Sequence, residues 1–161
     1  MTEDLTRIRV LCVDDHPVVR QGITMLLAVE PDMALVAEAS NGREAIQQYR
    51  AHRPDVTLMD LQMPGMGGAE ATAAIRRAGG SRSRVPIIAV TAHAMKEVRE
   101  EILAAGMQDL ITKPIDKEEL AATIERWTGI DSKGAQRDDR IAENDLLAVS
   151  TVGRNLTKSC Q

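Results

Sequence analysis

The chain has 161 residues, which suffices for one domain with a hydrophobic core and an appendage but not for two ordinary domains. Aromatic residues make up only 1% of it and phenylalanine is absent, so we expect a core of Val, Ile, Leu, Met and Ala. The net charge of −4 gives no electrostatic reason to expect nucleic acid as a partner. Because no signal-peptide stretch and no window of transmembrane length is found, we expect a cytoplasmic protein without membrane contact.

Five short apolar runs alternate along the chain with segments in which apolar residues recur at helical spacing. The runs, which we predict to be strands, are residues 8–13, 33–39, 55–59, 85–90 and 109–112. Two of the predicted helices span residues 43–52 and 69–78, and the other three are indicated by apolar residues that share a helical face within 19–27, 98–105 and 120–127. The sequence therefore predicts five strand-helix units in a row.

This alternation, with nearly unbroken apolar strands, predicts a parallel sheet that is covered by helices on both faces. The expected fold class is α/β, with a five-stranded parallel sheet of the open, doubly wound form. We expect residues 1–7 to be an N-terminal extension, residues 8–128 the domain, and residues 129–161 a polar, flexible C-terminal tail. In an open sheet of this kind the functional crevice lies beyond the carboxyl ends of the strands, so strand ends supply the candidate site.

Polar side chains stand at the end of four predicted strands. Asp14 and Asp15 follow the first strand, Asp60 the third, Thr91 the fourth and Lys113 the fifth. A single aspartate in such a place is most often a solvated cap. Because the carboxyl ends of parallel strands meet at one edge of a sheet, however, we expect all five side chains to converge.

This set of residue types indicates a phosphoacceptor site. Three clustered carboxylates repel one another and favour a cation between them, and Mg²⁺ suits such oxygen ligands while leaving room for a phosphoryl group. With the Lys113 ammonium neutralising phosphoryl oxygens and the Thr91 hydroxyl donating a hydrogen bond, Asp60 can attack phosphorus and form an acyl phosphate. The sequence therefore predicts Mg²⁺ as cofactor and Asp60 as the nucleophile.

Four stretches, spread from Ile8 to Trp127, resemble the receiver domain of two-component response regulators. They are VDDHPVVRQGI, MDLQMPGMGG, VPIIAVTAHA and AAGMQDLITKPI. The resemblance implies a flavodoxin-like sheet of strand order 2-1-3-4-5. It also implies that a sensor histidine kinase or a histidine phosphotransfer protein donates the phosphoryl group to Asp60.

The same resemblance implies a role for each metal ligand. Asp15 and Asp60 match direct Mg²⁺ ligands, together with the backbone carbonyl of Gln62, and Asp14 matches a ligand that acts through water. The family's lysine-proline bond is commonly cis, and the Lys113–Pro114 bond can adopt this form at modest cost.

Thr91 and Lys113 match the family's switch hydroxyl and phosphate-binding lysine. Gln62 and His93 match positions that tune dephosphorylation, and because neither is a carboxylate base we expect slow self-dephosphorylation; His93 as a plain exposed loop residue is the other interpretation. Leu110 stands where many receivers have an aromatic residue. The phosphorylation chemistry is expected to remain. In the family's usual readout the aromatic ring turns inward as the switch hydroxyl moves, and the resemblance gives no ground to expect this readout from a leucine.

The predicted function is a phosphorylation-dependent signalling switch rather than an enzyme that turns over an external substrate. We expect its output to pass to a downstream protein, or to a second copy, through the surface from Ala94 to Gly106 and from Asp109 to Trp127. Two alternatives stay open: a DNA-binding transcriptional regulator with a truncated or unrecognised output segment, and a metal-dependent aspartyl phosphatase. His16 and His52 are interpreted as the start and the end of helices, without a functional role.

Overall fold

A computed structural model describes residues 7–78, 80 and 84–129 of the chain. Apart from one residue each, the predicted N-terminal extension (1–7) and C-terminal tail (129–161) lie outside the described residues. The domain boundaries therefore stay predictions. No helix in the described part of the chain has both the length and the apolar composition needed to cross a membrane.

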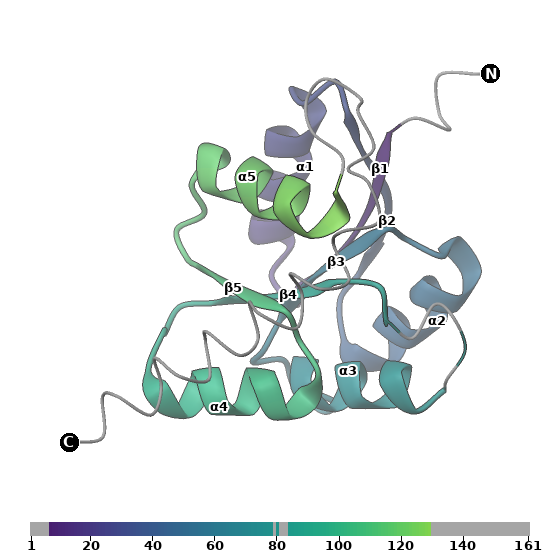
Figure 1. Cartoon of the computed structure of the whole chain (residues 1–161), viewed down its shortest axis with the longest axis vertical. Helices are drawn as coiled ribbons and strands as arrows, with labels where there is room; N and C mark the ends of the chain where they lie inside the picture. Colours follow the sequence, from purple (N-terminus) through teal and green to yellow (C-terminus); the bar gives the residue numbers. More distant parts are fainter. Residues whose placement is uncertain (1–6, 79, 81–83, 130–161) are drawn as a thin grey trace.

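Strands and helices alternate from β1 to α5 (Figure 1). The strands are β1 (Ile8–Val13), β2 (Met33–Ala39), β3 (Val56–Asp60), β4 (Ile87–Thr91) and β5 (Asp109–Thr112). The helices are α1 (Pro17–Ala28), α2 (Gly42–His52), α3 (Gly68–Arg77), α4 (Lys96–Ala105) and α5 (Lys117–Thr128). The five predicted strand-helix units are thus confirmed.

All five strands run parallel in one sheet of order β2-β1-β3-β4-β5, which confirms the predicted fold class and strand order. β3 and β4 end one residue later than predicted, because the main chains of Asp60 and Thr91 are still paired within the sheet. Asp60 pairs with Val90, and Thr91 pairs with Thr112. Both candidate site residues are therefore the last residues of strands and not the first residues of loops.

Helices cover both faces of the sheet: α1 and α5 lie on one face, and α2, α3 and α4 on the other (Figure 1). Side chains alternate between the two faces along each strand. In β1, Leu11 and Val13 belong to one buried cluster, whereas Val10 and Cys12 belong to the other. Tyr49, which is only 6% exposed, is an exception to the predicted aliphatic core. Burial on both faces explains why the strands read as unbroken apolar runs.

Candidate functional site

The register between β1 and β3 brings two of the predicted carboxylates together. These strands pair in parallel up to Val13 and Met59. The aspartates that follow these two residues, Asp14 and Asp60, therefore lie side by side at the carboxyl edge of the sheet. Both are buried, with exposed fractions of 1% and 4%. Buried carboxylates need a compensating charge or hydrogen bonds. Asp60 is therefore not a solvated strand cap.

Lys113 supplies part of that compensation. Its ammonium Nζ donates to Asp14 Oδ2 at 3.0 Å and lies 3.7 Å from Asp60 Oδ1. The lysine is held in place by its own backbone, whose N–H donates to the Thr91 carbonyl at 2.8 Å. The Lys113–Pro114 peptide bond is cis, as the resemblance implies. One ammonium thus faces two carboxylates and leaves an excess of negative charge.

A third carboxylate and an imidazole complete the cluster. Asp14, Asp15, His16 and Asp60 each offer one ligand atom, and these four atoms all lie within 4.8 Å of one another. Asp15 Oδ1 is buried and accepts no hydrogen bond from any described residue. A buried oxygen without a donor, among three carboxylates, fits a hard divalent cation with oxygen ligands. The residues present therefore fit Mg²⁺.

Electrostatics favour a cation here as well. Burial raises the pKa of the Asp60 carboxyl to about 6, and the neighbouring Asp14 carboxylate adds to the rise. The Lys113 ammonium and the backbone N–H of Gln62 lower the pKa, but together they do not offset the rise caused by burial and Asp14. A cation among these oxygens would favour the ionised form of Asp60, which is the nucleophilic form.

The remaining predicted residues surround this cluster. Thr91 is buried, and its hydroxyl Oγ1 accepts a hydrogen bond from the His93 backbone N–H at 3.3 Å. The Gln62 N–H donates to Asp60 Oδ1 at 3.4 Å. The side chains of His93 and Gln62 are exposed at the rim of the site. Metal ligation by the Gln62 carbonyl and tuning of dephosphorylation by either residue stay predictions.

The glycines after Asp60 shape the loop that joins β3 to α3. Gly65 has a φ of +76°, a left-handed conformation that favours glycine. Gly68 begins α3 directly against the end of β3, and its N–H donates to the Leu61 carbonyl at 3.1 Å. A Cβ at Gly68 would overlap the Asp60 carbonyl oxygen and lie 2.9 Å from Met59 Cγ. Gly68 thus permits a close contact that positions the main chain of Asp60.

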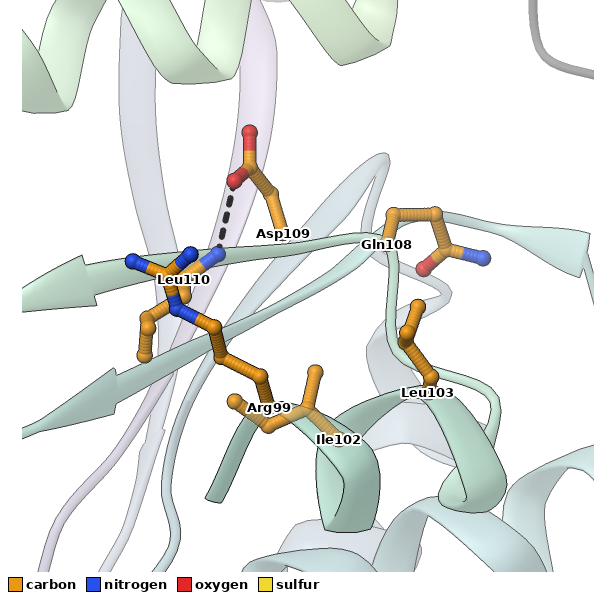
Figure 2. A pocket seen from close by; sticks show the side chains of 6 residues that line it. All are labelled: Arg99, Ile102, Leu103, Gln108, Asp109 and Leu110. Atoms are coloured by element: carbon orange, nitrogen blue, oxygen red, sulfur yellow. Dashed lines mark hydrogen bonds between the residues drawn. The ribbon is translucent and has the colours of Figure 1, made fainter. Parts of the chain in front are cut away.

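Leu110, the predicted departure from the aromatic position, is half-buried on β5. It faces an open pocket of about 200 Å³ between α4 and β5 (Figure 2). The pocket is lined by Arg99, Ile102, Leu103, Gln108, Asp109 and Leu110. None of these six residues is aromatic: three are aliphatic and three are polar or charged.

The interpretation of His16 as a helix start without function misses its position at the site. His16 is the N-cap residue of α1, as expected, but its Nδ1 lies 3.2 Å from Asp14 Oδ1 and 3.1 Å from Asp15 Oδ1. The signal in the sequence was its place directly after two site aspartates. His52 lies at the carboxyl end of α2, which leads into the start of β3, away from the strand ends that form the site.

Comparison with known proteins gives a consistent result. Residues 10–125 match the family model of the response regulator receiver domain. The chain is 42% identical to the sensor protein GacS of Pseudomonas syringae pv. syringae over 76% of its length, and 39% identical to the response regulator GacA of Pseudomonas viridiflava over 73%. It spans only 14% of that sensor protein and 53% of that response regulator.

A solved structure resembles the fold closely. It is the receiver domain of the sensor histidine kinase PA1611 from Pseudomonas aeruginosa PAO1, with a magnesium ion coordinated in its active site cleft. The two chains are 36% identical and superpose with a TM-score of 0.69, over 76% of this chain and 98% of that one. Sensor kinases and separate response regulators are thus both found among the relatives.

Proposed function

This chain belongs to the family of response regulator receiver domains, and on that premise we propose that it is a switch that accepts a phosphoryl group on Asp60. Members of this family act as phosphoacceptors in two-component signalling rather than as enzymes that turn over an external substrate. The observation that supports Asp60 is its buried carboxylate, which lies 3.7 Å from the Lys113 ammonium and within the acidic cluster.

In the proposed reaction an Asp60 oxygen attacks the phosphorus of a phosphohistidine on the donor protein. The phosphorus-nitrogen bond breaks, the donor imidazole leaves, and an acyl phosphate remains on Asp60. The Lys113 ammonium stands where it can neutralise a phosphoryl oxygen, and the Thr91 hydroxyl can donate to another. The donor we propose is a sensor histidine kinase or a histidine phosphotransfer protein.

We assign Asp15 and Asp60 to hold Mg²⁺ directly, with the Gln62 carbonyl as a further ligand and Asp14 acting through a water. The ion, when bound, would neutralise charge on the phosphoryl oxygens and so reduce the repulsion between the phosphoryl group and the Asp60 carboxylate. The acidic cluster supports this assignment, and so does Asp15 Oδ1, which accepts no hydrogen bond from any residue that the structure describes.

Acetyl phosphate tests the proposal without knowledge of the donor protein. The full chain is incubated with acetyl phosphate and Mg²⁺, and its intact mass is measured. We expect the gain of one phosphoryl group, which depends on Mg²⁺ and is lost on addition of EDTA. An unchanged mass, or a gain that is insensitive to EDTA, would contradict the proposed chemistry.

Lys113→Ala is expected to slow phosphorylation by acetyl phosphate by roughly one to two orders of magnitude, because it removes the ammonium beside Asp60. The rate is followed by intact mass over time. Lys117→Ala, which removes an exposed lysine at the start of α5, is the matched control and should leave the rate unchanged. Equal rates in the two variants would show that Lys113 does not assist the transfer.

The phosphorylated protein is expected to lose its phosphoryl group slowly, over many minutes. Gln62 and His93 stand at the rim of the site, and neither is a carboxylate that could serve as a base for an attacking water. The measurement is the decay of the phosphorylated mass after removal of acetyl phosphate by desalting. A lifetime of seconds would contradict this expectation.

For the output we propose the surface from Ala94 to Gly106 and from Asp109 to Trp127. It holds the pocket of Figure 2, and Met95 at its edge is 60% exposed. A downstream protein or a second copy of the chain would contact this surface after phosphorylation. Size-exclusion chromatography of the phosphorylated and unphosphorylated chain distinguishes the second copy from a separate partner.

A further inference from the structure

We propose that His16 is a fourth side-chain ligand of the metal site. Its imidazole raises the affinity of the site for first-row transition ions that bind nitrogen, such as Co²⁺ or Zn²⁺, above the affinity that three carboxylates alone would give. This inference rests on the metal site of the proposed function. It goes beyond that function by adding a ligand and a metal preference to the site.

The first support is distance. His16 Nδ1 lies 3.1 Å from Asp15 Oδ1 and 3.2 Å from Asp14 Oδ1. Adjacent ligands of an octahedral ion with bonds of about 2.0 to 2.2 Å stand roughly 2.8 to 3.1 Å apart. The imidazole nitrogen and Asp15 Oδ1, a direct ligand of the proposed site, are therefore spaced like neighbouring ligands of one ion.

The second support is hydrogen bonding. An imidazole nitrogen carries either one hydrogen or one lone pair, so Nδ1 cannot donate fully to two carboxylates at once. Its contact with Asp14 Oδ1 meets hydrogen-bond criteria, whereas Asp15 Oδ1 stays buried without a hydrogen bond from any described residue. A cation between Nδ1 and Asp15 Oδ1 would satisfy both atoms, while Asp14 Oδ1 keeps the hydrogen bond from the His16 backbone N–H.

The third support is the backbone. The His16 N–H donates to Asp14 Oδ1 at 2.8 Å, and Pro17 follows at the start of α1, so the ring is held over the cluster from a defined position. The His16 side chain forms no capping hydrogen bond to the helix. It is 64% exposed, which leaves space beside it for water and a phosphoryl group. Its replacement should therefore not disturb α1.

The preference follows from donor chemistry. Carboxylate and carbonyl oxygens suit Mg²⁺, whereas imidazole suits transition ions, whose affinity for a mixed nitrogen and oxygen site exceeds that of the alkaline-earth ions. His16→Ala should consequently lower the affinity for Co²⁺ at least about tenfold and the affinity for Mg²⁺ less than about threefold. Co²⁺ serves as the probe because it is paramagnetic.

The test uses the full chain at pH 8, as wild type, His16→Ala and His52→Ala. Isothermal titration gives the affinities for CoCl₂ and MgCl₂, and proton NMR of the Co²⁺-loaded protein detects the strongly shifted, exchangeable N–H of a bound imidazole. We expect this signal in the wild type and in His52→Ala, and its loss in His16→Ala. The melting temperature without metal, equal in all three, verifies that each variant folds.

Two results would overturn the inference: a shifted N–H that persists in His16→Ala, or a loaded wild type without such a signal. Failure to bind either ion would overturn it together with the proposed metal site. The proposed phosphoacceptor function is tested separately. It fails if incubation with Mg²⁺ and acetyl phosphate leaves the mass of the wild type unchanged, and this result does not depend on whether His16 binds Co²⁺.

Discussion

Asp60→Asn is expected to abolish the mass gain from acetyl phosphate. The asparagine side chain has nearly the same shape, but its amide carries no negative charge and is a poor nucleophile toward phosphorus. Asp60 is also the carboxylate whose neighbours can serve phosphoryl transfer, because the Lys113 ammonium lies 3.7 Å away and the Asp14 and Asp15 oxygens complete a cation site. Intact mass with and without acetyl phosphate measures the effect directly.

This loss must be separated from unfolding. Asp60→Asn removes one of three clustered carboxylates, and burial and Asp14 already raise the pKa of that carboxyl, so the variant should melt at the same temperature as the wild type or higher without metal. Asp116→Asn is the matched control, since Asp116 is exposed and makes no capping hydrogen bond to α5. A phosphoryl gain that persists in folded Asp60→Asn would assign the acceptor to another residue.

Gly68→Ala is expected to lower the free energy of unfolding by about 1 to 3 kcal/mol, and to slow phosphorylation as well. The new methyl group would overlap the Asp60 carbonyl oxygen and crowd Met59 Cγ. Because backbone atoms of a buried strand cannot yield as an exposed side chain can, α3 must move away from β3 and shift the nucleophile. Urea unfolding measures the first effect and mass over time the second.

Gly22→Ala is the matched control with the opposite sign. Gly22 lies on the exposed side of α1, and a Cβ there would meet nothing within 4 Å. Alanine has the higher helix propensity, so this variant should gain about 0.5 to 1 kcal/mol of stability. A gain in stability in Gly68→Ala, like the gain expected for Gly22→Ala, would show that the contact at Gly68 is unimportant.

The fold was predictable because its elements bury apolar surface in patterns that are local in sequence. β3 reads as an apolar run because it is buried on both faces, and α1 shows one apolar face because Ile23 and Leu27 are buried in the core and Val19 and Leu26 pack against it. The ends of β3 and β4 were less predictable. They are decided by hydrogen bonds to neighbouring strands, which pair Asp60 with Val90 and Thr91 with Thr112.

The membership of the candidate site was also predictable, since parallel strands end at the same edge of a sheet. Asp14, Asp60 and Lys113 could be chosen from their places at strand ends, and the structure does bring them together. His16 could not be chosen in this way, because it lies in the turn after β1, and the direction of its ring depends on the backbone between Asp14 and Pro17.

By itself, then, the sequence determined the fold class, the strand-helix order and the set of residues at the strand ends, because hydrophobic periodicity and strand-end position are local properties. Only the tertiary structure decided which side chains touch. The register between strands places the Lys113 ammonium on Asp14, burial raises the pKa of Asp60, and a missing Cβ at Gly68 lets α3 pack against β3. These properties depend on distances between residues far apart in the chain, which no local pattern contains.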